Sequence, residues 1–275
     1  MLRISTISFP GLGIGEFNLN SVAFEIGSLT VAWYGIILTL GIIGAIAYLV
    51  YRRNYCNMSL DDIIDFALVV VPMGIIGGRL YYVLTSLEKY HSFYDVIAIW
   101  NGGLAIYGAI IGGAAGVILM CYLKKKNFFA IADCVCPGVL IGQILGRWGN
   151  FFNGEAFGYE TDIFCRMGVK NALTYGQTLY VHPTFLYESL WNIVGLILIN
   201  LFFKHKKYNG QIFFMCFAWY GLGRMFIEGL RSDSLYIFGN IRISQVVGGI
   251  CFVVFGGLLL YNLIREKMKK NKESV

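Results

Sequence analysis

Residues 131–158 read IADCVCPGVLIGQILGRWGNFFNGEAFG, an apolar run with a polar end. Its first part is mostly apolar and is long enough for a membrane-crossing helix, which needs about 20 residues. The run then ends in a cation, two amides and a carboxylate, at Arg147, Asn150, Asn153 and Glu155. An ionised side chain at membrane depth costs roughly 2.5–3.5 kcal/mol on insertion scales, so such groups usually mark a functional site.

The composition of the whole chain is that of an integral membrane protein. Of its 275 residues, 57% are hydrophobic and 14% are charged, and the mean hydropathy is +0.65. Soluble domains are less apolar and disordered chains are more charged, while the long continuous apolar runs exclude a β-barrel. The sequence therefore predicts an all-α protein, a single polytopic domain with seven transmembrane helices at about residues 29–50, 63–84, 103–123, 131–151, 184–203, 211–229 and 243–264.

Lysine and arginine fall mainly on one side of this predicted topology, and cytoplasmic loops are the ones enriched in them. The alternate loops that contain them lie at 52–53, 124–126, 204–207 and 265–272. We therefore expect the N-terminus outside, with residues 1–27 as an external arm, and the C-terminus in the cytoplasm. A small external head, residues 152–183, joins spans four and five. The net charge of +6 comes largely from the inner loops, so it indicates a membrane surface and not nucleic acid.

Glycines four residues apart in two predicted spans favour close helix packing in lipid. Gly108, Gly112 and Gly116 recur in the third span, and Gly74 and Gly78 in the second. Their spacing predicts that these two helices meet over small residues, with packing as their role.

The predicted topology brings polar side chains from several spans toward the outer face. Among them, Arg224 and Glu228 lie four residues apart on one helix and can pair. Guanidinium groups bind phosphate oxygens bidentately and stay charged, so arginines with a few carboxylates at the lipid–water boundary favour a phospholipid headgroup. The candidate site residues are Tyr34, Tyr107, Arg147, Asn150, Asn153, Glu155, Tyr220, Arg224, Glu228 and Arg231.

Three alternatives compete with an enzyme that acts on lipid. The first is that the arginines only extend to the interface and contact lipid passively, but several charged residues on two spans weigh against it. The second is a seven-span transporter, which would use the same charges for anion passage and usually has broken helices or repeats; we find neither in the sequence. The third is a membrane scaffold, which needs no catalytic group. Detection of a reaction product separates these alternatives.

The motifs resemble those of the bacterial prolipoprotein diacylglyceryl transferase family over nearly the whole chain. Gly146–Gly158 is similar to the family signature, and further matches are WYG at 33–35, NGGL at 101–104, HPTFLYE at 182–188 and YGLGRMFIEGLR at 220–231. The resemblance implies a seven-helix enzyme of the bacterial cytoplasmic membrane. Such an enzyme moves the diacylglyceryl group of phosphatidylglycerol to the lipobox cysteine thiol in prelipoprotein signal peptides and releases glycerol phosphate. The resemblance implies neither a metal nor a cofactor.

The same resemblance implies roles for individual residues. Arg147 and Arg224 bind the phosphate and offset the charge that develops on the leaving group. Asn150 and Asn153 supply neutral hydrogen-bond donors, and Glu155 and Glu228 orient the arginines. Tyr34 and Tyr220 orient the headgroup or the peptide. Arg231 is a further binding residue.

Tyr107 departs from the family pattern, because many members have a histidine there that is a proposed general base. A phenol has an unperturbed pKa near 10 and is a weak base at neutral pH, whereas a thiol near 8.5 loses its proton more easily. Two hypotheses stay open. Either Tyr107 is the base, or it only orients the substrate, while the phosphate, water or an arginine-lowered thiol pKa accounts for the proton.

Overall fold

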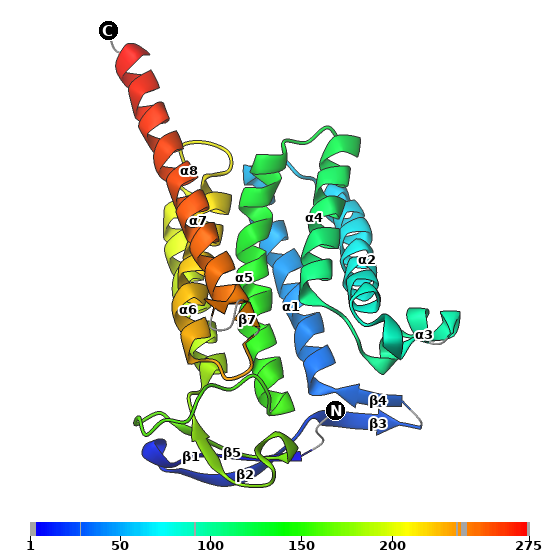
Figure 1. The fold of residues 1–275 in the computed structure, drawn as a ribbon. Helices are drawn as coiled ribbons and strands as arrows, with labels where there is room; N and C mark the ends of the chain where they lie inside the picture. Colours follow the sequence, from blue (N-terminus) through cyan, green and yellow to red (C-terminus); the bar gives the residue numbers. More distant parts are fainter. Residues whose placement is uncertain (1–3, 28, 91, 235, 238–240, 274–275) are drawn as a thin grey trace. The chain divides into compact units, whose positions relative to one another are not determined.

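The computed structural model describes the chain except for residues 1–3, 28, 91, 235, 238–240 and 274–275. Every predicted apolar segment forms a long helix (Figure 1). The helices are α1 Trp33–Arg52, α2 Leu60–Leu84, α4 Ile106–Leu123, α5 Phe128–Asn153, α6 Thr184–Phe203, α7 Gln211–Ile227 and α8 Ile243–Glu273. The prediction of an all-α protein is therefore confirmed only in its coarser form, a mainly helical fold.

Six of these helices, within the residues that the structure describes, are long and apolar enough to cross a membrane. The exception is α7, which has 17 residues and spans about 26 Å at 1.5 Å per residue, against roughly 30 Å of hydrocarbon. The chain is a multi-pass helical membrane protein by this criterion, and a seventh span remains a prediction.

The N-terminal region contains strands that the sequence analysis did not predict. Residues Val22–Ile26 (β3) pair antiparallel with Leu29–Ala32 (β4), and the backbone N–H of Trp33 donates to the carbonyl of Ser21 at 3.0 Å. The first helix therefore begins at Trp33 and not at residue 29. The β-branched Thr30 and Val31 suit an extended strand better than a first helical turn.

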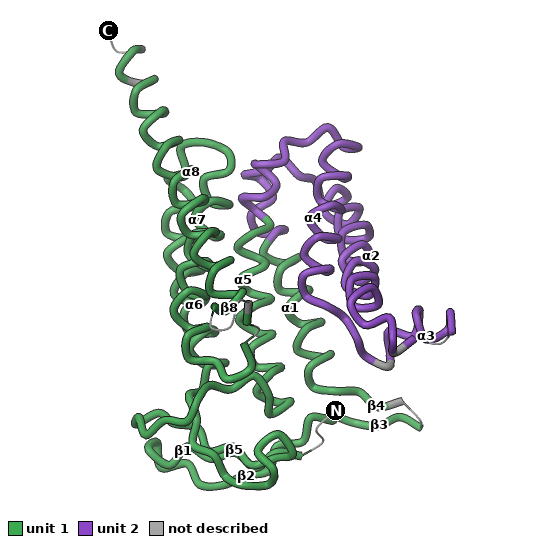
Figure 2. The backbone as a smooth tube through the Cα atoms, in the orientation of Figure 1, with its two compact units in different colours: residues 1–48, 135–275 green, residues 49–134 purple. Residues whose placement is uncertain are grey.

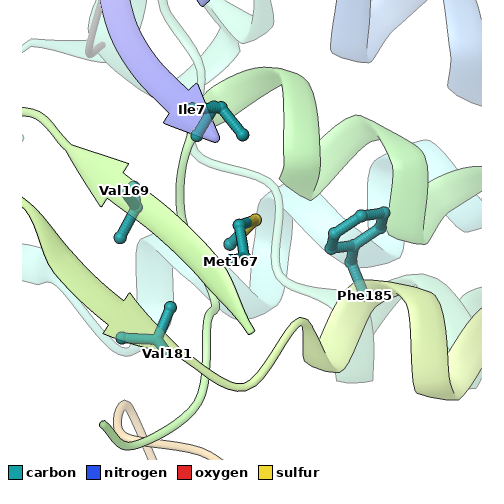
Figure 3. Packing of buried hydrophobic residues seen from close by; sticks show 5 residues of the cluster. All are labelled: Ile7, Met167, Val169, Val181 and Phe185. Carbon is teal, nitrogen blue, oxygen red and sulfur yellow. The ribbon is translucent and has the colours of Figure 1, made fainter. Parts of the chain in front are cut away.

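A four-stranded antiparallel sheet joins the N-terminus to the predicted head segment. Its order is β2-β1-β5-β6, with β1 at Ile4–Phe9, β2 at Ile14–Asn20, β5 at Met167–Lys170 and β6 at Leu179–Val181. Figure 3 shows the buried cluster that it packs around, made of Ile7, Met167, Val169, Val181 and Phe185. Because Phe185 belongs to α6, this cluster fixes the sheet to the start of that helix.

The chain divides into two compact units, residues 1–48 with 135–275 and residues 49–134 (Figure 2). In the second unit, α2 packs closely on α4, with the short helix α3 Phe93–Ile97 between them in sequence. A Cβ on Gly108 would lie 2.2 Å from the carbonyl oxygen of Gly77, and one on Gly112 would lie 2.2 Å from that of Met73. The predicted packing over small residues is confirmed, with Gly77 at the closest approach.

In the first unit, α7 and α8 also cross where both helices carry glycine. A Cβ on Gly221 would lie 2.6 Å from the carbonyl oxygen of Gly248, so the two backbones touch at this point. Side chains connect α5 to α6: the indole N–H of Trp148 donates to Ser189 Oγ at 3.2 Å, and Asn192 donates to Gln143 at 3.3 Å. These contacts bring together the helices that carry the candidate site.

Candidate active site

The buried carboxylate of Glu188, on α6, lies at the centre of the candidate site. Its side chain is 4% exposed and pairs with three guanidinium groups. Arg147 Nη2 lies 2.8 Å and Arg224 Nη1 lies 3.0 Å from Glu188 Oε2, while Arg231 Nη1 lies 3.1 Å from Oε1. Two arginines from different helices thus converge on one oxygen atom.

The C-terminal end of α7 supplies a second buried carboxylate. Arg224 Nη2 pairs with Glu228 Oε2 one turn along the chain, as their spacing predicts. The Glu228 side chain is 3% exposed, so Glu228 and Glu188 both face Arg224 in a site with little water. We call Arg147, Glu188, Arg224, Glu228 and Arg231 the arginine–glutamate cluster.

Arg231 is held on both sides by carboxylates. Besides Glu188, it donates from Nε and Nη2 to the two oxygens of Asp233 at 3.0 and 2.8 Å. Burial alone would lower the pKa of Arg231, but the hydrogen bonds to Asp233 and the charges of Glu188, Asp233 and Glu228 together raise it. Arg231 therefore stays charged at any physiological pH. Asp233 is 47% exposed, so water screens much of its charge.

The end of α5 reaches the cluster through amides. Arg147 Nη1 donates to Asn150 Oδ1 at 3.2 Å, and Asn150 Nδ2 donates to Glu155 Oε1 at 3.3 Å. Asn153 Nδ2 also donates to Glu155 Oε1, at 2.8 Å. Glu155 thus acts on Arg147 through Asn150, whereas Glu188 contacts the arginine directly.

A glycine turn after α5 puts Glu155 in this place. Gly154 has φ +63°, in the left-handed region that commonly ends a helix, and a Cβ there would lie 2.1 Å from Ser5 Oγ. The side chain of Asn171 donates to both the Gly154 carbonyl (2.8 Å) and Ser5 Oγ (3.1 Å). The sheet therefore holds the turn that returns Glu155 toward Asn150.

Two tyrosines of the predicted site border the same region of the first unit. The ring of Tyr34 on α1 packs against Gly149, where a Cβ would lie 2.6 Å from its Cδ2. Tyr220 lines a small pocket with Glu188, Trp191, Gly223 and Arg224 among its other walls. The pocket has room for roughly one water molecule.

Tyr107 belongs to the other unit. It lies in the first turn of α4, is 43% exposed, and its ring centroid is 6.4 Å from that of Tyr81. The arginine–glutamate cluster lies entirely in the first unit, so a role for Tyr107 beside it remains a prediction.

Arg79, also in the second unit, has its guanidinium group occupied by backbone carbonyls. It donates to the carbonyl oxygens of five residues in the segment before α4, which are Asp95, Val96, Ala98, Gly102 and Gly103. Because these hydrogen bonds use all of its side-chain nitrogens, we assign Arg79 to holding this segment.

We expect Arg79→Ala to loosen the segment that precedes α4. Hydrogen bonds to charged groups contribute about 1.5–3 kcal/mol each. Loss of even one should therefore raise the fraction of molecules in which this segment is detached roughly tenfold or more. Trypsin should then cleave the reconstituted protein after Lys89 at least about tenfold faster than the wild type. The exposed Lys125→Ala serves as control, and an unchanged cleavage rate would show that the segment does not depend on Arg79.

Two members of the site, Glu188 and Asp233, are not among the residues predicted from the sequence. Glu188 had a usable signal, because it is a carboxylate inside a predicted span and carries the same insertion cost that identified Glu155. Asp233 lies two residues after Arg231, outside the long apolar runs, where acidic residues are common. Among the described residues, no group of three or more His, Cys, Asp or Glu side chains is arranged to hold a metal ion.

Comparisons with known proteins agree on one family. Residues 21–261 match the prolipoprotein diacylglyceryl transferase family. The chain is 42% identical over 262 residues to phosphatidylglycerol–prolipoprotein diacylglyceryl transferase 1 of Clostridium perfringens, covering 94% of this chain and 99% of that protein. The chain is also similar to the phosphatidylglycerol–prolipoprotein diacylglyceryl transferase of Lactobacillus delbrueckii subsp. bulgaricus, with 41% identity over 260 residues that cover 91% of this chain and 94% of that protein. The transferase of Listeria welshimeri is 38% identical over 261 residues, which cover 92% of this chain and 94% of that protein. The whole arginine–glutamate cluster lies within the matched residues.

Proposed function

The chain belongs to the prolipoprotein diacylglyceryl transferase family, and we propose that its arginine–glutamate cluster binds the phosphate of phosphatidylglycerol during the transfer. The enzyme transfers the diacylglyceryl group of phosphatidylglycerol to a prolipoprotein. In the proposed reaction, the lipobox cysteine sulfur attacks the glyceryl carbon that bears the phosphate ester. The carbon–oxygen bond breaks, a thioether forms, and glycerol phosphate leaves with the thiol proton.

The convergence of Arg147 and Arg224 on one oxygen carries this proposal. Both guanidinium groups lie within 3.0 Å of Glu188 Oε2, so their positive charges lie close enough together to act on one phosphate group bound beside Glu188. Negative charge grows on the phosphate as the carbon–oxygen bond breaks. Donors already fixed in a dry site stabilise that charge without reorganisation, and such stabilisation usually contributes more to catalysis than any other single effect.

The remaining site residues support the two arginines. Glu188 and Glu228 hold the guanidinium groups and limit their mutual repulsion, because both carboxylates are buried beside them. Asn150 connects Arg147 to Glu155, Asn153 also donates to Glu155, and both amides supply neutral donors. Tyr34 and Tyr220 orient the headgroup or the peptide, and Arg231 extends the cationic surface.

A direct assay tests the proposed function. Purified protein in phosphatidylglycerol vesicles, given a lipobox peptide, should release glycerol phosphate and raise the peptide mass by one diacylglyceryl group. A peptide with serine in place of the lipobox cysteine is the matched control and should stay unmodified. A transporter or a scaffold would leave the cysteine peptide unmodified as well, and that result would contradict the proposal.

We propose that the membrane is the bacterial cytoplasmic membrane, crossed by seven helices of one polytopic domain with the N-terminus and residues 152–183 outside. The positions of the basic loops support this orientation. A prelipoprotein keeps its lipobox near the outer face under this topology, on the same side as the ends of α5 and α7 that carry the cluster.

Reporter fusions test the orientation. A reporter that is active only in the cytoplasm should work when fused after Lys126, Lys207 or Lys270 and stay silent after Lys170, because lysine-rich loops are retained inside. An active fusion at Lys170 would reverse the topology and put the cluster on the wrong side for a prelipoprotein.

The effect of Tyr107→Phe distinguishes the two hypotheses for Tyr107. Loss of an orienting hydroxyl costs about 0.5–1.5 kcal/mol net, whereas a general base contributes roughly 10²–10⁴-fold in rate. We expect the milder loss, about tenfold or less, measured with phosphatidylglycerol and a lipobox peptide over a pH series. A loss of three or more orders of magnitude at every pH, in intact protein, would identify the phenol as the base.

A further inference from the structure

Two tryptophans join α6 to α7 by a reciprocal contact. The rings of Trp191 and Trp219 are stacked, with centroids 4.4 Å apart and planes 19° apart. Each indole N–H donates to the backbone carbonyl oxygen of the other tryptophan, both at 3.0 Å. A buried indole N–H needs an acceptor, and here each helix supplies the acceptor for the other.

Each tryptophan also lies over a glycine of the opposite helix. A Cβ on Gly195 would lie 2.2 Å from Trp219 Nε1, and one on Gly223 would lie 2.3 Å from Trp191 Nε1. Both helices therefore carry the same pattern, Trp-x-x-x-Gly, at 191–195 and 219–223. A shift of either helix by one residue would put a Cβ into an indole ring, so the contact fixes the register of α6 against α7.

This contact lies beside the arginine–glutamate cluster. Glu188 precedes Trp191 by three residues, which places both on one face of α6, and Arg224 directly follows Gly223. Trp191 and Gly223 line the same small pocket as Glu188 and Arg224. The register set by the tryptophans thus determines how far the carboxylate on α6 lies from the guanidinium on α7.

We propose that Trp191 and Trp219 are positioning residues for transfer, acting by holding Glu188 within hydrogen-bond distance of Arg224. The inference rests on the proposed role of the cluster in binding phosphate. Glu188 reaches Arg224 at 3.0 Å, and catalysis is sensitive to displacement on this scale, since about 1 Å of misplacement can lower a rate roughly a hundredfold.

The test compares steady-state transfer by Trp191→Phe, Trp219→Phe and the double variant, in vesicles of phosphatidylglycerol with a lipobox peptide. Phenylalanine keeps an aromatic ring but removes the indole donor. We expect each single variant to lower kcat about tenfold or more, with KM for the peptide within about twofold of wild type. The double variant should have a kcat no lower than that of either single variant.

Trp100→Phe is the control, because Trp100 belongs to the other unit and is 61% exposed. Normal kcat in the single variants, whether or not their thermal midpoints fall, would make the pair a packing contact only.

A second comparison shows whether the tryptophans act through Glu188. In a Glu188→Asp background, where the carboxylate is already withdrawn from Arg224, Trp191→Phe should change kcat by less than about twofold while still lowering the thermal midpoint. A full additional loss of kcat in that background would overturn the inference. Failure of the proposed phosphate site gives a different result from failure of this inference. Arg224→Ala would then transfer normally, whatever the tryptophan variants do.

Discussion

Arg147→Ala and Arg224→Ala should each lower the rate of diacylglyceryl transfer by at least about a hundredfold, to near background. Both guanidinium groups meet at Glu188 Oε2, so each variant removes one of the two neighbouring cations proposed to bind the phosphate group. Loss of a single preorganised donor to a developing oxyanion costs roughly 10²–10³ in kcat. The initial rate of glycerol phosphate release, per folded molecule in phosphatidylglycerol vesicles, measures the effect.

Charge and geometry can be separated at the same positions. Arg147→Lys and Arg224→Lys keep the positive charge but lose the planar guanidinium group that binds two oxygens at once. Their transfer rates should therefore lie between those of the wild type and the alanine variants. Arg265→Ala, on the exposed part of α8, is the matched control for loss of an arginine and should transfer normally. Near-normal turnover in folded, membrane-inserted Arg147→Ala or Arg224→Ala would exclude the phosphate site at this cluster.

The helices and the polar end of α5 could be predicted from the sequence because their causes are local. A continuous apolar run specifies a membrane helix whatever it packs against. The ionised side chains within residues 147–155 carry an insertion cost at membrane depth, so they mark a candidate site whichever residue ends the helix. The Arg224–Glu228 pair is equally local, since four residues make one helical turn. The prediction that these residues share one face needed no knowledge of the other helices.

The sheet and the position of Glu188 depend on contacts between distant residues. β1 pairs with β5, which lies after several long helices in the chain, and each strand alone is too short for a clear pattern. Glu188 is visible as a carboxylate in an apolar run, but its partners depend on the rotation of α6. That rotation is set by contacts such as Trp148 with Ser189 and Trp191 with Trp219, which no single segment of sequence specifies.

Glu188 gives the last prediction, which concerns stability as well as transfer. Its removal leaves Arg147, Arg224 and Arg231 close together with one fewer buried carboxylate between them. Breaking a buried ion pair by removing one partner costs about 3–5 kcal/mol. We therefore expect Glu188→Ala to lower the thermal midpoint in detergent clearly and to reduce transfer at least about a hundredfold. Glu160→Gln, an exposed carboxylate of the head segment, is the control for loss of a negative charge.

Inorganic phosphate should distinguish a phosphate site from an ordinary ion-pair cluster. In Glu188→Ala the three guanidinium groups lose the carboxylate that they share, and an added anion can take its place. Phosphate should therefore raise the thermal midpoint of Glu188→Ala more than that of the wild type or of Glu160→Gln, while chloride at equal ionic strength should not. Anything that binds only the folded state stabilises it in proportion to the logarithm of its concentration over its Kd, so the shift should grow steadily with phosphate. Equal shifts in all three proteins would mean that the arginines do not form a phosphate site once Glu188 is gone.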